Sequence, residues 1–393
     1  MTHSTTRPIK VMHIIARLNI GGAAVYVIEL VEQLNALGYD AQLICGVVGS
    51  SEGDMRYIAD ERHVPVQVLP RLGREISFLG DLSTVFQLWR LMRRERPDIV
   101  HTHTAKAGLV GRFAAWLSGV PVIVHTFHGH VFAGYFGGLK TRLFLQLERL
   151  CARLSTRIVT LSPDLKRDLV TVYRIAPADK IEVIELGFDL RKLLEAEQWA
   201  SPFRLEQNIP EDARLIGIVG RLVPIKNHEL FFAAAKLVLE QFPAAYFAVV
   251  GDGERRTELE ALAHALGIAD HVRFTGWIID PVPVYAALDV LVLCSKNEGL
   301  PVSLIEAMAA GVPVVATAVG GVNDLLEGGR LGAIVPPDDA AALSGAILNI
   351  LPMTNAIAAQ KIAAAAVEAV RDRYDIGQSA AKTDALYRRL LHK

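Results

Sequence analysis

The sequence Val290-Leu-Val-Leu293 leads into Glu298-Gly-Leu-Pro-Val-Ser-Leu-Ile-Glu306-Ala-Met-Ala-Ala-Gly311, and Pro313-Val-Val-Ala-Thr317 follows. Two apolar β-type runs thus enclose one helix, whose first turn fits Pro301 and which ends at Gly311 and Pro313. A strand, a helix and a second strand in this order predict parallel strands joined by a crossover helix.

The same alternation of strand and helix occurs in two sets along the chain. The predicted strands are 10–15, 41–45, 66–69, 98–101, 121–125, 157–162 and 181–184 in the first set, and 215–219, 245–250, 272–275, 290–293, 313–317 and 332–335 in the second. The predicted helices include 23–37, 81–95, 106–118, 139–154, 228–241, 254–266, 283–288, 302–310, 338–350, 356–370 and 377–391. Near-continuous Val/Ile strands indicate sheets buried on both faces, so we expect two doubly wound α/β domains.

The domain boundaries follow from the loss of this pattern between the two sets. We expect a first domain at 1–186, a linker at 187–210 and a second domain at 211–376. Ligands of such sheets bind at the carboxyl ends of the strands, so a cleft between the domains is the expected site.

Composition and charge restrict the classes of function. The 393 residues are 51% hydrophobic with a formal net charge of −1, which argues against a nucleic-acid-binding protein. Residues 71–174 nevertheless hold 16 Lys+Arg against 7 Asp+Glu, a balance of +9. We therefore expect an anionic partner for the first domain.

The cysteines and the apolar runs indicate the compartment. Cys45, Cys151 and Cys294 lack metal or redox spacing and are interpreted as reduced core thiols of a cytoplasmic protein. The amino terminus has no signal-peptide core, and no apolar run reaches the ~18 residues of a spanning helix. The chain is expected to be soluble or to lie on a membrane surface.

Glu298 and Glu306 lie on either side of a predicted helix start. Helix geometry separates them by roughly 7–8 Å along the axis, which is about the distance from a ribose to a sugar beyond its diphosphate. The helix N-terminus between them favours phosphate. The alternative is a capping acid and a solvated helix acid with no ligand.

This segment resembles the Glu-x7-Glu signature of retaining GT-B glycosyltransferases of family 4, which includes bacterial enzymes of cell-surface polysaccharide synthesis. The resemblance implies that Glu306 binds the ribose hydroxyls and that Glu298 lies beside the transferred sugar. Gly299 and Leu300 are expected to line the same donor site. It also implies that the last helix, 377–391, packs back on the first domain.

Gly220-Arg221-Leu-Val-Pro-Ile-Lys226 follows the first strand of the second domain. A cation pair at a strand end suits a departing diphosphate and can replace a metal ion. The element resembles the Gly-Arg-Leu-x5-Lys type of the family, here with four residues between Arg221 and Lys226. The alternative is an ordinary surface Arg and Lys.

Three glycine-containing turns follow other strands. Gly21-Gly22 allows close approach of backbone to phosphate, although an ordinary strand–helix turn is nearly as good an interpretation. Gly251-Asp-Gly253 is not a dinucleotide fingerprint, because Arg256 stands where the third glycine belongs. The resemblance places Gly251 and Trp277 near the nucleotide.

Two histidine-containing segments end strands of the first domain. His101 and His103 share a strand face and could chelate a metal, but no further ligand pattern accompanies them, so no metal is expected. His103 and Lys106 are predicted on the acceptor side. His128 matches the histidine that the family places beside the transferred sugar, where imidazole can bind a hydroxyl or move a proton.

The predicted helix 139–154 has two distinct stripes. One consists of Leu139, Leu143, Leu147, Leu150 and Leu154, and another of Arg142, Arg149 and Arg153. One interpretation is a core face and a solvated face. The other is a platform for an anionic membrane or a lipid diphosphate acceptor.

The resemblance covers essentially the whole chain. It implies a metal-independent, retaining hexosyltransferase that needs no cofactor and whose substrate is a nucleotide-diphosphate sugar, with UDP favoured and GDP open. The acceptor would be a glycan or a lipid-linked glycan, and the protein would be cytoplasmic, with a peripheral membrane location left open. A nucleotide-sugar epimerase of the same fold and a non-catalytic nucleotide-sugar-binding protein remain alternatives.

Overall fold

The structure is a computed structural model that describes residues 7–49, 53–73, 78–129, 138–196, 202–351 and 356–392. It divides the chain into two compact units, each built on one parallel sheet. The first unit comprises Met1–Phe188 and Tyr374–Lys393, and the second comprises Asp189–Arg373. The chain therefore passes between the units twice, after Phe188 and again after Arg373.

The first unit is built on a seven-stranded sheet in the order β3-β2-β1-β4-β5-β6-β7. Its strands are β1 Lys10–Arg17, β2 Asp40–Gly46, β3 Val66–Val68, β4 Ile99–His103, β5 Val122–Phe127, β6 Arg157–Thr160 and β7 Ile181–Val183. Every pairing is parallel. The order reverses between β1 and β4, as in a doubly wound sheet.

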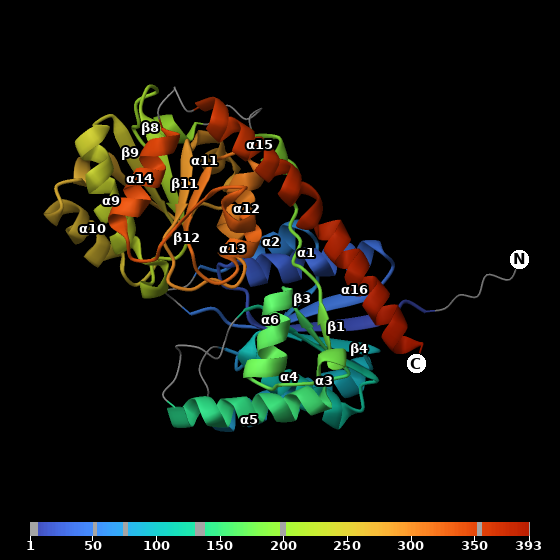
Figure 1. The fold of residues 1–393 in the computed structure, drawn as a ribbon. Helices are drawn as coiled ribbons and strands as arrows, with labels where there is room; N and C mark the ends of the chain where they lie inside the picture. The colour runs from blue at the N-terminus through green and yellow to red at the C-terminus, as the bar shows by residue number, and fades with distance from the viewer. Residues whose placement is uncertain are drawn as a thin grey trace, which may run out of the picture. The chain divides into compact units, whose positions relative to one another are not determined.

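Helices cover both faces of this sheet (Figure 1). They are α1 Gly22–Ala36, α2 Arg56–Glu61, α3 Phe78–Glu95, α4 Ala105–Ser118, α5 Gly138–Leu154, α6 Pro163–Arg167 and α16 Ile376–Leu391, with helical turns η1 Asp168–Val172 and η2 Ala178–Lys180. Helices α3, α4 and α5 lie side by side on one face, whereas α16 packs against α1 on the other.

The second unit is built on a six-stranded parallel sheet in the order β10-β9-β8-β11-β12-β13. Its strands are β8 Arg214–Val219, β9 Ala245–Val250, β10 Val272–Gly276, β11 Val290–Leu293, β12 Val314–Thr317 and β13 Ala333–Val335. Its longer helices are α9 His228–Gln241, α10 Arg256–Ala265, α11 Val282–Ala287, α12 Val302–Ala309, α14 Ala340–Ile350 and α15 Ala356–Arg373. The predicted class, two doubly wound α/β domains, is confirmed.

The stretch expected as a linker, 187–210, is largely folded onto the second unit where it is described. It contains the short helices α7 Arg191–Leu194 and α8 Phe203–Glu206, and α8 buries Phe203. Arg204 donates to the carbonyl of Ala287 and pairs with Asp289 at 2.8 Å. The segment 197–201 lies outside the described residues.

The structure overturns the interpretation of the α5 leucines as a core face. Leu143 and Leu150 are 64% and 49% exposed, and the side chain of Leu139 is not described. The buried side of α5 instead presents Glu148, Cys151 and Ala152. Burial of the Glu148 carboxylate is possible because Arg112 of α4 pairs with it at 2.6 Å.

Candidate functional site

The loops at the carboxyl ends of the second sheet are tied to one another by backbone hydrogen bonds. Gly220, after β8, donates to Val250 at 2.9 Å, and Gly251, after β9, donates to Gly276 at 2.9 Å. Lys296, after β11, donates to the carbonyl of Ile225 at 2.8 Å. The loops of the second unit that carry Arg221, Lys226, Gly251, Trp277 and Glu298 are therefore joined to one another.

Close backbone packing explains the glycine at position 251. Its φ is +132°, and a Cβ there would lie 2.1 Å from the carbonyl oxygen of Gly220 and 3.4 Å from the ring of Trp277. Only glycine fits such an approach. The structure thus brings Gly251 and Trp277 together beside the loop that begins at Gly220.

Lys226 and Glu298 form an ion pair. Lys226 Nζ lies 2.5 Å from Glu298 Oε1, and their side chains are 21% and 12% exposed. The hydroxyl of Ser295 donates to the same carboxylate oxygen, also at 2.5 Å. These two donors fix the Glu298 carboxylate just before α12. The ion pair places Lys226, which is predicted to bind the diphosphate, beside Glu298, which is predicted to bind the sugar.

Arg221 follows Gly220 on the same loop as Lys226 and is partly buried. Within the described ranges its guanidinium has no hydrogen bond or ion pair to another residue. A partly buried cation of this kind retains its donors for a ligand.

Glu306 lies inside α12, as predicted, and Glu298 lies before the helix. The hydroxyl of Tyr285, in α11, donates to Glu306 Oε2 at 2.6 Å. Burial raises the pKa of Glu306 to about 7, although the hydrogen bond from Tyr285 acts in the opposite direction. The carboxyl group of Glu306 therefore titrates near neutral pH.

The rest of the Glu298 loop rests on two glycines. A Cβ at Gly320 would lie 1.8 Å from the carbonyl oxygen of Glu298, and one at Gly321 would lie 2.2 Å from that of Gly299. Gly321 also donates to the carbonyl of Glu298 at 3.3 Å. Gly299 is exposed and Leu300 is partly buried, so both can contact a ligand.

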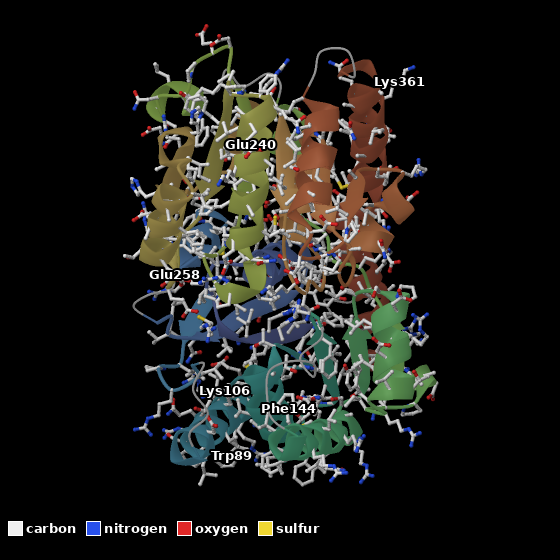
Figure 2. All side chains as sticks on the ribbon, turned by 60° about the vertical axis from the view of Figure 1, so that its left-hand side comes forward. Trp89, Lys106, Phe144, Glu240, Glu258 and Lys361 are labelled. Atoms are coloured by element: carbon white, nitrogen blue, oxygen red, sulfur yellow. The ribbon has the colours of Figure 1, made fainter. Side chains whose placement is uncertain are left out.

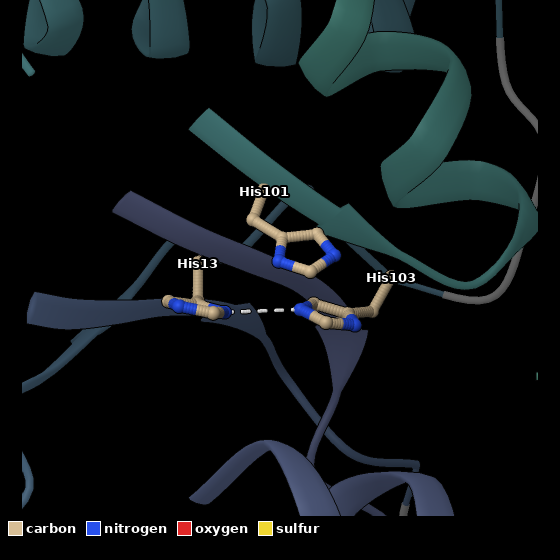
Figure 3. Close-up of side chains that lie close together, drawn as sticks. All are labelled: His13, His101 and His103. Atoms are coloured by element: carbon tan, nitrogen blue, oxygen red, sulfur yellow. Dashed lines mark hydrogen bonds between the residues drawn. The ribbon is translucent and has the colours of Figure 1, made fainter. Parts of the chain in front are cut away.

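The predicted histidines of the first unit belong to a buried hydrogen-bonded chain. His103 of β4 bonds His128 on one side and His13 of β1 on the other, each at 3.0 Å between ring nitrogens. Figure 3 shows the bond between His13 and His103, with His101 beside them. His101 bonds Tyr387 of α16 at 2.6 Å.

Burial keeps these rings neutral. It lowers the pKa of His13 to about 3 and that of His128 to about 4, and it lowers the pKa values of His101 and His103 well below their ordinary range. Nδ1 of His128 is buried and has no hydrogen-bond partner among the described residues. That atom is the one in this chain of rings that can still bind a ligand.

His13, His101 and His103 lie close enough to suggest a metal centre. One nitrogen from each lies within 4.8 Å of the others. The ring of His103 is stacked on those of His13 and His101, however, and both nitrogens of His101 bond protein hydroxyls, those of Tyr387 and Thr126. The geometry fits a hydrogen-bonded network better than converging metal ligands, and the absence of a metal stays a prediction.

The other predicted residues of the first unit lie near the start of two helices. Gly21 and Gly22 begin α1, and Tyr26 of that helix lies edge-on to His128, with ring centroids 6.0 Å apart. Lys106 begins α4 and pairs with Asp81 at 2.9 Å. Its assignment to the acceptor side stays a prediction.

Several residues at the site were not found from the sequence. Tyr285, Ser295 and His13 each bond a predicted site residue, and Tyr387 bonds His101 of the same network. All of them except Ser295 come from a different element of the chain than the residue they bond. Ser295 alone had a local signal, since it stands three residues before Glu298 in the same loop.

Comparison with known sequences identifies the family. A profile described as "Glycosyl transferases group 1" matches residues 201–368, and one described as "Glycosyl transferase 4-like domain" matches residues 21–187. The UDP-Gal:alpha-D-GlcNAc-diphosphoundecaprenol alpha-1,3-galactosyltransferase of Escherichia coli is 30% identical over 88% of this chain and 89% of its own. The 2-deoxystreptamine N-acetyl-D-glucosaminyltransferase of Streptomyces fradiae is 34% identical over 90% and 88%.

Solved structures share the fold over nearly the whole chain. HepE from Anabaena, solved in complex with UDP and glucose, matches with a TM-score of 0.82 at 21% identity, covering 96% of this chain and 99% of that one. Sucrose-phosphate synthase from Thermosynechococcus elongatus matches with a TM-score of 0.81 at 24% identity, covering 98% and 99%. This chain belongs to the group 1 glycosyltransferases of GT-B fold, with a glycosyltransferase 4-like first domain.

Proposed function

We propose that this protein transfers a hexose-type sugar from a nucleoside diphosphate donor to a glycan or lipid-linked acceptor, without a metal ion and with retention at the anomeric carbon. The supporting observation is the loop after β8, where Arg221 has no protein partner among the described residues and Lys226 is paired with Glu298. A UDP-sugar is the favoured donor, and a GDP-sugar is the second choice.

Two cations on one loop can stabilise the charge that develops on a leaving diphosphate. The bond between the anomeric carbon and the diphosphate oxygen breaks, and the acceptor oxygen bonds the same carbon on the same face. The acceptor proton passes to the departing phosphate oxygen. Glu298 then serves to position the sugar, because Lys226 and Ser295 fix its carboxylate.

The remaining roles are those that the resemblance to the family implies. Glu306 would accept hydrogen bonds from the ribose hydroxyls, and the N-terminus of α12 before it would face the diphosphate. His128 would bind a sugar hydroxyl through Nδ1, the ring nitrogen that has no partner among the described residues.

The relatives differ in their acceptors, so the comparisons do not define the acceptor of this protein or its location in the cell. The name of the E. coli relative specifies a lipid diphosphate acceptor, whereas that of the S. fradiae relative specifies 2-deoxystreptamine. None of the helices within the described ranges is long and apolar enough to cross a bilayer. A cytoplasmic enzyme that binds the inner membrane surface peripherally would suit a lipid-linked acceptor.

The test is release of nucleoside diphosphate from a panel of UDP- and GDP-sugars, with and without acceptors, in the presence of EDTA. Arg221→Ala and Lys226→Ala should each lower turnover on the order of 10²-fold. Lys236→Ala, a substitution in α9 away from these loops, is the control and should leave turnover unchanged. Loss of activity with EDTA and rescue by Mg²⁺ would contradict the assignment of the two cations.

The outcome also separates the alternatives. Release of diphosphate only when an acceptor is present excludes an epimerase, and any turnover excludes a binding protein. Glu306→Ala should weaken binding of the nucleoside diphosphate by about 1.5–3 kcal/mol in calorimetry, because the ribose hydroxyls lose their acceptor.

A further inference from the structure

Helices α3, α4 and α5 expose large apolar side chains on the outer face of the first unit. Leu82 and Phe86 of α3 are 59% and 58% exposed, and Trp116 and Leu117 of α4 are 52% and 46% exposed. Figure 2 labels Trp89 of α3 on this side of the unit, and the ring of Trp89 lies against that of exposed Phe86, with centroids 5.6 Å apart. Exposed apolar surface this extensive on neighbouring helices marks an interaction site.

Helix α5 continues this apolar surface and adds charge to it. Leu143 and Leu150, two turns apart, are exposed, and so are Arg142 and Arg153. Apolar and basic side chains thus alternate around the free side of one helix. This pattern is typical of helices that lie in the plane of a membrane interface.

The stretch of sequence that contains these three helices is strongly basic. From Phe78 to Leu154 the sequence has 10 Lys+Arg and 4 Asp+Glu. Two of the four acids, Asp81 and Glu148, are paired inside the unit with Lys106 and Arg112. The charge that remains on the exposed face is therefore predominantly positive.

A basic cavity lies at the carboxyl end of α5. It has a volume of about 390 Å³, and four cations line it, Arg149 and Arg153 of α5 with Arg174 and Lys180. The other described residues that line it are apolar, and none is an acid. Arg149 and Lys180 donate to backbone carbonyls, which fixes their positions. Four cations around one cavity repel one another unless an anion occupies it.

We propose that the outer face of α3, α4 and α5 binds the surface of an anionic lipid bilayer, with the cavity between Arg149 and Lys180 receiving a lipid phosphate group. Aromatic and leucine side chains would enter the boundary between headgroups and acyl chains, as amphipathic interfacial helices do. Aromatic residues and arginine are also enriched in protein interfaces, but the excess of positive charge on this face and around the cavity favours an anionic lipid surface.

Only one part of this inference rests on the proposed function, namely that the enzyme meets a lipid-linked acceptor at this surface. Binding of lipid needs neither donor nor turnover. The two proposals can therefore fail separately.

The experiment is flotation of the full-length protein with vesicles of phosphatidylcholine alone or of phosphatidylcholine and phosphatidylglycerol in equal amounts, at low and high salt. The protein should bind the anionic vesicles, and added salt should weaken binding. Arg142→Glu/Arg153→Glu should reduce the partition coefficient at least about fivefold per reversed charge. Leu143→Asp/Leu150→Asp should reduce binding even at low salt.

The control is Leu205→Asp/Arg371→Glu, which makes the same kinds of change at exposed positions of the second unit, where Leu205 is 83% exposed. It should bind vesicles as the wild type does. Thermal unfolding of each variant establishes that it is folded, and UDP binding should be equal in all of them.

Any of several results would overturn the proposal. The wild type could fail to float with anionic vesicles, the control could lose as much binding as the α5 variants, or the free protein could dimerise through this face. Vesicle binding without any nucleotide-sugar turnover would instead count against the proposed function alone. Displacement from vesicles by inorganic phosphate at constant ionic strength would assign the cavity to a soluble phosphate and also overturn the lipid assignment.

Discussion

The titration of Glu306 gives the proposed nucleotide site a measurable pH dependence. Burial raises its pKa to about 7, and only the ionised form can accept hydrogen bonds from both ribose hydroxyls. Nucleotide binding should therefore favour the ionised form and release a proton near neutral pH. Between pH 8 and pH 6 we expect the affinity for UDP to fall by about tenfold from this group.

Calorimetry in buffers of different ionisation enthalpy would measure both the affinity and the proton release. Glu306→Gln is the control, since its amide does not titrate while the phosphate of UDP still does. If the wild type and Glu306→Gln show the same pH dependence, Glu306 does not bind the ribose.

The buried histidines of the first unit should make its stability sensitive to acid. His13 has a pKa lowered to about 3, whereas an unfolded histidine titrates near 6.5, so the unfolded chain takes up a proton that the folded chain does not. The contribution of the neutral, buried His13 to the free energy of unfolding is fully present above pH 6.5. It is lost as the pH falls from 6.5 toward the pKa of His13 in the folded protein. Each such histidine contributes a slope of about 1.4 kcal/mol per pH unit.

Urea unfolding between pH 7 and pH 5, above the range where most carboxylates titrate, would measure this slope. His13→Gln should reduce the slope by about one proton, although it also lowers stability by removing the bond to His103. His63→Gln changes an exposed histidine of the first unit and is the matched control. Equal slopes in all three proteins would contradict the neutral, buried assignment.

Local sequence indicated the predicted ligands but not the residues that orient them. Glu298 and Glu306 could be found because a strand, a loop and a helix start follow one another in the chain. Tyr285 and Tyr387 could not, because each reaches its partner only after distant elements have packed together. No motif or fixed spacing in a single sequence identifies residues that contact a site in this way.

Among the connecting elements, the loop after β12 holds the loop after β11 in place. Gly320 has φ +49°, and a Cβ there would overlap the carbonyl oxygen of Glu298. Gly320→Ala should therefore displace Glu298, lower turnover, and destabilise the protein by more than the ~1–2 kcal/mol that a left-handed alanine costs alone. Turnover and urea unfolding would test this.

Gly328→Ala is a matched control, because Gly328 has φ +65° and a Cβ added there would meet no other atom within 4 Å. It should show the backbone cost without loss of activity. Equal loss of turnover in the two variants would mean that the position of Glu298 does not depend on Gly320.

The alternation of apolar runs predicted the strands and the long helices. It did not predict the shortest helices or which face of a helix is buried. Helices α2 and α13 Val322–Leu325 are under two turns long and show no periodicity. The leucine stripe of α5 suggested a buried face, yet its buried side contains Glu148. That side is explained only by Arg112, a partner 36 residues away in the sequence.

At the level of the molecule, the second unit is inserted into the sequence of the first. Helix α16, which ends the chain, completes the first unit, and Phe188 and Asp375 form a β-bridge where the chain leaves and re-enters it. Each unit has its own buried core, the first around Ile14 and Val100 and the second around Phe231 and Phe247. Two compact units with separate cores are expected to unfold as separate cooperative units.

Tyr387 provides the test of that expectation. It is fully buried in α16 and bonds His101, so Tyr387→Ala removes a large core side chain and leaves a buried imidazole without its partner. The free energy of unfolding of the first unit should fall by about 3–5 kcal/mol, and that of the second unit should not change. Tyr387 and its partner His101 both belong to the first unit, although 286 residues separate them in the sequence. Differential scanning calorimetry should show one transition moved to lower temperature and another unchanged. Phe247 is a core residue of the second unit, so Phe247→Ala should lower the temperature of the second transition instead. If the nucleotide binds to the second unit, UDP should raise the temperature of that same transition. A single transition that shifts equally in both variants would show that the two units unfold as one.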